Sequence, residues 1–439
     1  MKKVVKFGGS SLANAEQFQK VGDIIRSDES RRYVVPSAPG KRFDEDIKVT
    51  DMLYGCYDAA SKGEDITEKI NAIKARYYEI IKGLGLSLSL EEEFKKIDED
   101  FRAQAGIQYA ASRGEFLNGK IMAAYLGYEF IDAAEVIVFD ENGNFDGDET
   151  HKILSERLEN TERAVIPGFY GAKPDGSIQT FSRGGSDITG SIVAKAVHAD
   201  MYENWTDVSG FLIADPRIIK NPKPIDVITY RELRELSYMG ATVLHEDAIF
   251  PVRKEGIPIN IRNTNAPEDK GTLIVEDTCR KPRFTITGIA GKKDFASITI
   301  EKAMMNSEVG FCRKVLEVFE NNNISIEHMP SGIDTMTIFV HRDEFEEKEQ
   351  DVIAGIHRAV EPDFLELESD LALIAVVGRG MRATRGTSGR IFAALAHANV
   401  NVKMIDQGSS ELNIIIGVRS HDFDAAINAI YDIFVKTMI

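Results

Sequence analysis

An internal repeat in the C-terminal part of the chain constrains its fold more than any other feature of the sequence. Three pairs of matching residues, each 76 positions apart, mark it: Gly310 with Gly386, Asn323 with Asn399, and Gly332 with Gly408. In both copies the asparagine begins a short apolar stretch that follows an amphipathic helix. A repeat of this length predicts two copies of one small domain.

Each copy has the element order βαββαβ, which predicts a ferredoxin-like domain. In the first copy we expect strands at 297–301, 324–329, 335–341 and 364–368 and helices at 310–321 and 347–359. In the second we expect strands at 372–377, 400–405 and 411–418 and helices at 387–398 and 423–434. A last strand would fall beyond residue 439. We expect residues 284–290 to supply it, so that the first copy (296–370) is inserted into the second (284–290 plus 371–439).

In residues 1–280, strands alternate with helices. Strands are expected at 2–7, 33–37, 128–131, 136–139, 163–169, 200–205, 258–262 and 272–275, and helices at 15–28, 66–81, 114–126, 188–198 and 230–240. Such alternation predicts a doubly wound α/β domain with a mostly parallel sheet. The polar, mostly helical segment 41–110 is expected to be an inserted helical cap. Ligands of such domains bind beyond the carboxyl ends of the strands.

The composition indicates a globular protein of several domains. Among 439 residues, Lys and Arg number 53 and Asp and Glu 70, a net charge of −17. This acidic balance argues against nucleic acid or an anionic membrane as a partner. Cys56, Cys279 and Cys312 are too far apart for a disulfide framework or a cysteine zinc site. For the same reason we expect no dedicated metal site. No membrane-spanning run or signal peptide is visible, so we expect a cytoplasmic protein.

Two glycine loops stand where a ligand of such a domain would bind. In the first, the strand that carries Lys6 runs into Gly8-Gly9-Ser10-Ser11 before a helix. Glycines let backbone N–H groups approach an anion, and the helix N-terminus adds unpaired donors. The pattern predicts a phosphate cradle, although it is not a Walker A loop. An ordinary βα turn explains the same residues equally well.

The second loop, Ser182-Arg183-Gly184-Gly185-Ser186-Asp187, precedes a helix and follows a hairpin pattern at 173–176. Arg183 can bind a carboxylate through two parallel N–H bonds. Asp187 is suited to hold a lysine or a metal near phosphates, and also to cap the helix.

Three further clusters, the first made of two segments, carry polar or glycine-rich patterns. Residues 205–210 and 214–217 close a strand, which favours a functional loop over a plain surface turn. Ser112-Arg113-Gly114-Glu115 is expected to start a helix, where the helix dipole alone would favour the carboxylate. Residues 378–383 match a dinucleotide-binding pattern, but the 56 residues that follow are too few for a dehydrogenase, and the repeat explains them better.

In order along the chain, these clusters resemble the amino-acid kinase family, and within it the aspartate kinases. The resemblance rests on K-F-G-G-S-S (6–11), S-R-G-E (112–115), S-R-G-G-S-D (182–187), W-T-D-V-S-G (205–210), A-D-P-R (214–217) and S-Y-M-G-A-T-V-L-H (237–245). The two small domains resemble ACT domains, which sense amino acids in that family. The resemblance implies phosphorylation of the β-carboxylate of L-aspartate with ATP and Mg²⁺. The product, 4-phospho-L-aspartate, would lead to lysine, threonine and methionine.

The resemblance also implies roles for single residues. Lys6 would stabilise charge on the transferring phosphoryl group, and Asp187 would organise Lys6 and the metal-bound nucleotide. The other nucleotide-binding residues would be Gly8, Gly9, Ser10, Thr206, Asp207 and Arg217. The aspartate-binding residues would be Arg183 at the α-carboxylate and Glu115 at the α-ammonium, with Ser37, Thr50 and Gly184. Because the acceptor carboxylate, with a pKa near ~4, is ionised at neutral pH, no general base is needed.

The resemblance places a regulatory amino acid on the first ACT copy, at Met305, Asn306, Ser307, Glu308, Ser325, Ile326 and Glu327. Lysine is slightly favoured over threonine because two of these residues are acidic and suit an ammonium. Solvated acids on a loop and an edge strand explain the same residues nearly as well. The second copy is expected to build an interface, and paired ACT domains imply a homodimer or homotetramer.

Two other interpretations stay open. One is an amino-acid sensor with an inactive kinase domain, against which Lys6, Glu115, Arg183 and Asp187 together argue. The other is a different amino-acid kinase, acting on glutamate, N-acetylglutamate or a nucleoside monophosphate.

Overall fold

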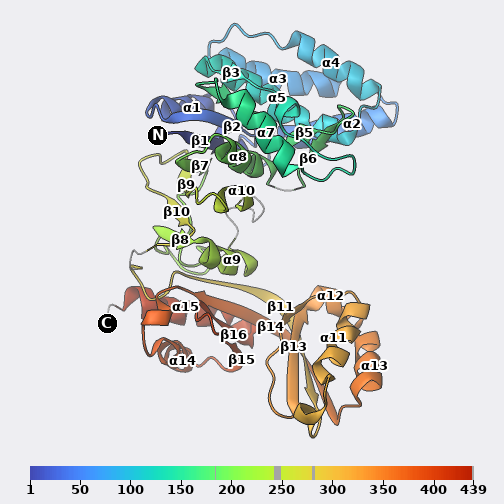
Figure 1. The fold of residues 1–439 in the computed structure, drawn as a ribbon, viewed down its shortest axis with the longest axis vertical. Coiled ribbons are helices and arrows are strands. Elements are labelled where there is room, and N and C mark those ends of the chain that lie inside the picture. Colours follow the sequence, from blue (N-terminus) through green and yellow to red (C-terminus); the bar gives the residue numbers. More distant parts are fainter. Residues whose placement is uncertain (183, 242–248, 279–281, 438–439) are drawn as a thin grey trace. The chain divides into compact units, whose positions relative to one another are not determined.

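The computed structural model describes residues 1–182, 184–241, 249–278 and 282–437 (Figure 1). The chain forms two compact units, and each is described by itself. The first contains Met1–Phe211, Pro224–Tyr230 and Val243–Thr278, and the second Leu212–Lys223, Arg231–Thr242 and Cys279–Ile439. In the described part of the chain, no helix is long and apolar enough to cross a membrane.

An eight-stranded sheet organises the first unit, in the order β3-β4-β2-β1-β7-β9-β10-β8. Its strands are β1 (Lys3–Phe7), β2 (Arg31–Pro36), β3 (Glu129–Phe130), β4 (Ala164–Val165), β7 (Met201–Thr206), β8 (Val227–Thr229), β9 (Ile259–Asn263) and β10 (Thr272–Val275). Among these strands only β9 and β10 pair antiparallel. The predicted mostly parallel sheet is therefore confirmed. Because β1 lies between β2 and β7, the carboxyl ends of these three strands meet at one edge.

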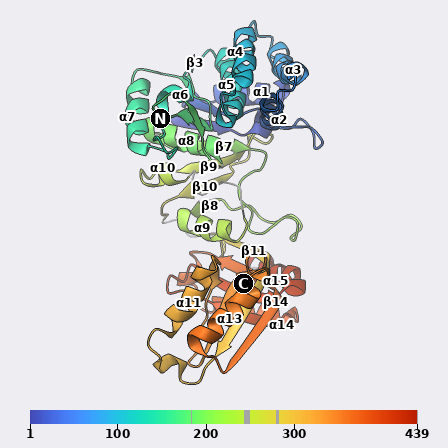
Figure 2. The ribbon, with the colours of Figure 1, turned by 90° about the vertical axis from the view of Figure 1, so that its right-hand side faces the viewer.

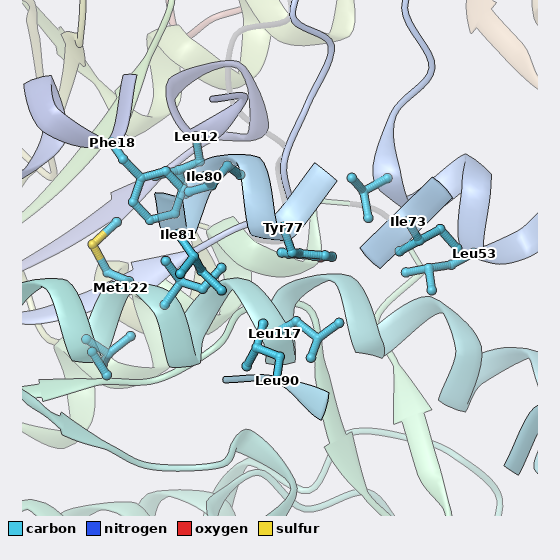
Figure 3. Packing of buried hydrophobic residues seen from close by; sticks show 14 of the residues in the cluster. Leu12, Phe18, Leu53, Ile73, Tyr77, Ile80, Ile81, Leu90, Leu117 and Met122 are labelled. Atoms are coloured by element: carbon cyan, nitrogen blue, oxygen red, sulfur yellow. The ribbon is translucent and has the colours of Figure 1, made fainter. Parts of the chain in front are cut away.

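The segment 41–110, expected to be a helical insertion, is mostly helical. It consists of α2 (Val49–Ser61), α3 (Thr67–Gly83) and α4 (Glu91–Arg102), and α5 (Ile107–Leu126) follows. Helices α3, α4 and α5 lie side by side in both views (Figures 1 and 2). Their apolar side chains form one core with those of β1 and α1 (Ala15–Arg26), and Tyr77 and Leu117 lie within this core (Figure 3). The insertion thus shares a core with the first sheet.

The remaining elements of the first unit include α6 (Ala133–Val136), α7 (Gly147–Leu158), α8 (Gly185–Ala196) and α10 (Phe250–Arg253). The hairpin expected around 173–176 is present, because β5 (Tyr170–Ala172) pairs antiparallel with β6 (Ile178–Thr180). Helix α9 (Tyr230–Tyr238) begins where the first unit passes into the second.

Three sequence predictions were wrong in detail. Residues 136–139 do not form a regular strand. Val136 ends the short helix α6, which Asp132 caps by accepting a hydrogen bond from Ala134 N (3.0 Å), and Val138 and Phe139 form only isolated bridges. The strand expected at 163–169 is only Ala164–Val165, and Pro167, which has no N–H, follows it. Helix α5 starts at Ile107 rather than 114, so Glu115 lies well inside it and the first-turn dipole argument does not apply.

The second unit contains a six-stranded antiparallel sheet, in the order β12-β13-β11-β14-β16-β15. Its strands are β11 (Gly288–Glu301), β12 (Ile326–His328), β13 (Thr335–His341), β14 (Phe364–Val377), β15 (Val402–Asp406) and β16 (Asn413–Arg419). Its helices are α11 (Phe311–Asn321), α12 (Arg342–Glu346), α13 (Glu349–Val360), α14 (Thr387–His397) and α15 (Phe423–Tyr431), followed by a π-helical turn (Asp432–Lys436).

The two long strands β11 and β14 serve both copies of the repeat. Residues 295–301 pair with β13, whereas 288–292 pair with 373–377 of the second copy. Of the segment 284–290, residues 288–290 thus pair with the second copy, as expected. The domain limits themselves stay a prediction, because 212–223 and 231–242 group with the second unit by compactness.

The repeat extends to backbone conformation. Gly310 (φ 85°) and Gly386 (φ 80°) precede α11 and α14 in the left-handed region, and Asn323 (φ 50°) and Asn399 (φ 57°) follow these helices in the same region. Glycine and asparagine are the residues that tolerate this conformation best. Two of the three residue pairs that revealed the repeat thus stand where the chain path needs a left-handed residue.

Candidate active site

A buried ion pair stands at the carboxyl edge of the first sheet. Lys6 Nζ lies 2.5 Å from Asp187 Oδ1, with the two side chains 10% and 17% exposed. Asn204 Nδ2 donates a 2.8 Å hydrogen bond to the same carboxylate oxygen. Lys6 and Asn204 are opposite each other on β1 and β7, and Asp187 lies in the first turn of α8. Three elements thus fix the direction of one ammonium group.

The first glycine loop lies directly beside this ammonium. Gly8 N donates to Trp205 O (3.0 Å), and a Cβ on Gly8 would lie 3.6 Å from Lys6 Nζ. Ser10 is exposed in the 3-10 turn Gly9–Leu12, whereas Ser11 is buried against Thr264 (Oγ to Oγ1, 2.8 Å). The structure therefore places Gly8 beside the Lys6 ammonium, with the exposed Ser10 in the turn that follows, and the phosphate cradle stays a prediction.

The loop between β2 and α2 contacts the other side of the cradle. Gly40 N donates to Gly9 O (2.8 Å), and a Cβ on Gly40 would lie 2.6 Å from Gly9 C. No side chain fits at this position without moving backbone. Ser37 N donates to Phe7 O (3.1 Å), and Asn118 Nδ2 to Ser37 O (2.6 Å).

Glu115 lies over this loop as a buried carboxylate. Its Oε2 has no hydrogen-bond partner among the residues that the structure describes. Burial raises the pKa of this carboxyl to about 7, although the backbone N–H groups of Ala38 and of Glu115 itself favour the charged form. Thr50 Oγ1 would lie 3.8 Å from a Cβ on the neighbouring Gly114. Thr50 and Glu115 are thus near one another, and the unpaired oxygen marks a position for a cationic ligand group.

The second glycine loop enters α8 through a left-handed residue. Gly184 has φ 59° and caps the helix, and a Cβ on Gly185 would lie 2.5 Å from the Phe169 ring. Arg183, which we expect to bind a carboxylate, lies outside the described residues. Asp187 lies in the first turn of α8 and pairs with Lys6, but it does not cap the helix, because Gly184 is the N-cap residue and no described side chain there accepts a capping hydrogen bond.

The other expected nucleotide residues fall in both units. Thr206 ends β7, and its hydroxyl donates to Asp207 Oδ1 (3.1 Å). Arg217 belongs to the second unit, where it is paired with Asp215 (2.6 Å) and its side chain is 86% exposed. Lys6, Gly8 and Asp187 thus lie together in the first unit, with Gly9 and Ser10 next along the chain. Arg217 belongs to the second unit.

Two site residues were missed from the sequence. Asn204 and Asn118 are 3% and 0% exposed, one in a central strand and one inside a helix. Neither stands in a purely apolar stretch, since Asn204 follows Glu203 and Asn118 is close to Glu115 and Lys120, so the sequence offered no local signal for their burial.

The side chains beside the glycine cradle could supply only some of the ligands of a magnesium ion. In the described parts of the chain no three His, Cys, Asp or Glu side chains gather as a metal site. Magnesium in phosphoryl-transfer sites is held mainly by phosphates and water, with one or two carboxylates. Asp187, beside the cradle, supplies one such carboxylate.

The expected regulatory residues lie on two segments of the second unit. Met305, Asn306 and Ser307 form a 3-10 turn, and both carboxylate oxygens of Glu308 are paired, with Lys302 (2.9 Å) and Lys314 (2.6 Å). Ser325 N donates to Glu344 (3.2 Å), and Ile326 and Glu327 belong to β12. The Glu327 side chain is only 6% exposed; it accepts a hydrogen bond from Tyr238 (2.7 Å) and lies 3.5 Å from His341 Nε2.

Comparison with known proteins agrees with these features. A model of the amino acid kinase family matches residues 1–263, and an ACT domain model matches residues 374–434. Aspartokinase 3 of Bacillus subtilis (strain 168) is 41% identical over 457 residues, which cover 98% of each chain.

Solved structures extend the comparison. Clostridium acetobutylicum aspartate kinase, described as an allosteric enzyme, is 53% identical with a TM-score of 0.93 and covers 98% of this chain and 100% of its own. E. coli aspartokinase III is 24% identical, which shows the fold alone. It was solved with lysine and aspartate (TM-score 0.73; 98% and 99% covered) and with aspartate and ADP (TM-score 0.72; 99% and 99% covered).

The raised pKa of Glu115 leads to a testable pH dependence. Its carboxyl has a pKa of about 7 in the folded protein, against an ordinary value of 4.5. Since burial disfavours the charged form, the wild type should lose stability relative to Glu115→Gln as pH rises. Urea unfolding at about pH 5 and about pH 8 should show the difference shifting by on the order of 2 kcal/mol in favour of the variant.

The matched control is Glu16→Gln, whose carboxylate is 75% exposed beside Lys20. Its stability difference from the wild type should not change between the two pH values. A pH-independent difference for Glu115→Gln as well would contradict the assigned titration.

Proposed function

The chain belongs to the amino acid kinase family, as an aspartokinase with ACT domains, and from this we propose that it transfers the γ-phosphoryl group of ATP to the β-carboxylate of L-aspartate. The observation that carries the proposal is the Lys6–Asp187 pair beside a glycine cradle, with the buried carboxylate of Glu115, on α5, next to the adjoining loop. The product, 4-phospho-L-aspartate, would lead to lysine, threonine and methionine.

The transfer needs charge neutralisation more than proton movement. A β-carboxylate oxygen forms a bond to the γ-phosphorus while the bond from that phosphorus to the bridging oxygen of ADP breaks. The nucleophile is already ionised, so no base removes a proton. Lys6 would face the developing negative charge together with N–H groups of the glycine loop other than that of Gly8, which donates to Trp205 O, and Asp187 and Asn204 would keep the ammonium in place. Magnesium, held in part by Asp187, would supply further positive charge on the phosphates.

The acceptor would bind between the second glycine loop and the loop that precedes α2. Glu115 suits the α-ammonium, because a cation would satisfy its unpaired Oε2 and favour its charged form. Arg183 is proposed to bind the α-carboxylate, with Ser37, Thr50 and Gly184 lining the pocket. Thr206, Asp207 and Arg217 are proposed to bind the nucleotide.

The choice of acceptor is tested by ADP release from MgATP. The wild type should turn over with L-aspartate and much more slowly, if at all, with glutamate, N-acetylglutamate or a nucleoside monophosphate. Turnover with one of these but not with aspartate would assign a different kinase activity. Absence of turnover with all of them would favour an amino-acid sensor.

Lys6→Met should lower kcat by about 100-fold or more while changing either KM far less. The reason is that the contact between the ammonium and the phosphoryl oxygens strengthens only in the transition state. Steady-state kinetics with both substrates varied measures the split. A variant with near-normal kcat would remove Lys6 from the chemistry.

We further propose feedback inhibition by lysine at the first ACT copy of a cytoplasmic homo-oligomer. Lysine is the ligand named for E. coli aspartokinase III, and it suits an acidic site. Glu308 is already neutralised by two lysines, whereas Glu327 is held by the neutral hydroxyl of Tyr238 and by His341. Glu327 is therefore the stronger candidate for the effector's ammonium, with Met305, Asn306, Ser307, Ser325 and Ile326 around it.

Glu327→Gln should raise the lysine concentration that gives half-inhibition by about 10-fold or more, because it removes the charge that pairs with the ammonium. Glu308→Gln is the matched control and should shift it by less than about 3-fold. Inhibition assays with lysine and threonine, singly and together, measure both variants. Equal shifts, or inhibition by threonine alone, would contradict the assignment.

A further inference from the structure

Arg76, on α3 of the helical insertion, is a buried charge that the proposed chemistry does not use. Its side chain is 6% exposed, and its neighbour Tyr77 lies in the core of the first unit (Figure 3). Its guanidinium Nη1 donates to Asp46 Oδ2 (2.9 Å) and Ile47 O (3.4 Å), and its Nη2 donates to Gly40 O (3.0 Å). All three acceptors belong to the loop between β2 and α2.

The same loop contacts the active site. Gly40 links the two sides directly, because its N–H donates to Gly9 O (2.8 Å) and its carbonyl accepts from Arg76. Ala38 lies against α5 beside Glu115, because a Cβ on Gly114 would lie 2.8 Å from Ala38 Cβ, and its backbone N–H favours the charged form of Glu115. The loop is flanked by the proposed aspartate residues Ser37 and Thr50. The loop is therefore held between the phosphate cradle on one side and the Arg76 guanidinium on the other.

A contribution to folding stability does not by itself explain why the Arg76–Asp46 ion pair is buried. Taking a guanidinium and a carboxylate out of water is costly, and buried pairs are often replaced by apolar residues without loss of stability. The side chain of Asp46 is 9% exposed, and its carboxylate is also bound by Arg42 (2.9 Å). The hydrogen bond from Arg42, with Arg76 as a further cause, holds the pKa of Asp46 well below its usual range. The loop carboxylate thus stays charged and keeps both arginines oriented.

We propose that Arg76 is a positioning residue for the acceptor site, which fixes residues 38–47 so that Gly40 and Ala38 meet the cradle and Glu115. This inference rests on the proposed function. It explains why the helical insertion lies here, because α3 anchors a buried cation whose forked donors hold three points of one loop. Aspartate binding depends on that loop, whereas the cradle's contacts through Lys6 and Gly8 do not.

Arg76→Met should therefore raise KM for aspartate by about 10-fold or more, while KM for ATP changes by less than about 3-fold. Arg76→Lys keeps a charge for Asp46 but lacks the fork, so it should restore part of the loss. Lys74→Met is the control, since Lys74 is also on α3 but pairs with Glu91 of α4 (2.5 Å) and does not touch the loop. It should leave both KM values unchanged.

Hydrogen exchange of the full-length protein provides a readout independent of activity. Amides of 40–47 should exchange faster in Arg76→Met and Asp46→Asn, with α3 itself unaffected. The proposal would be overturned if exchange in the loop or the KM for aspartate were unchanged. It would also be overturned if both KM values rose equally and amides throughout α3 exchanged faster. If Arg76→Met does not fold, Arg76→Lys and Asp46→Asn carry the same test. Wild-type turnover with another acceptor would contradict the function, yet the exchange result would still decide the role of Arg76.

Discussion

The contact between the backbones of Gly9 and Gly40 is the constraint on which the active site depends. A Cβ on Gly40 would lie 2.6 Å from Gly9 C, so the two loops meet only because neither has a side chain there. The contact places the loop that follows β2 against the loop that follows β1, at the edge where parallel strands end. The phosphate cradle and the acceptor pocket are thereby joined without any side chain spanning them.

Two charged side chains near this contact differ in whether they have partners: Lys6 is paired, and Glu115 has an unpaired oxygen. Lys6 is paired with Asp187, and Asn204 fixes the same carboxylate, so the cation is oriented before any phosphate arrives. Glu115 instead has an unpaired oxygen, and burial raises its pKa although the charge of Arg113 favours the ionised form. The proposed acceptor, with its own ammonium group, would pair with the Glu115 carboxylate and leave the Lys6–Asp187 pair in place.

Much of the fold and part of the site could be predicted from the sequence, because those features are local. The alternation of strands and helices, the hairpin at 173–176 and the glycine loops are each encoded within a few residues. The predictions for 136–139 and for the start of α5 were wrong because caps at Asp132 and Gly106 decide those boundaries, not apolar pattern. Arg76 and Asn204 carried no local motif, so their roles emerged only from contacts.

By itself the sequence determined the two glycine loops, the order βαββαβ and the repeat, since glycine and asparagine at fixed positions permit backbone turns that other residues resist. Only the tertiary structure decided that β11 and β14 pass through both copies, and that Arg76 reaches Gly40. It also decided that Glu115 is buried deeply enough to titrate near neutral pH. Pairing register, desolvation and the partners of a buried charge depend on residues far apart in the chain, and no local pattern specifies them.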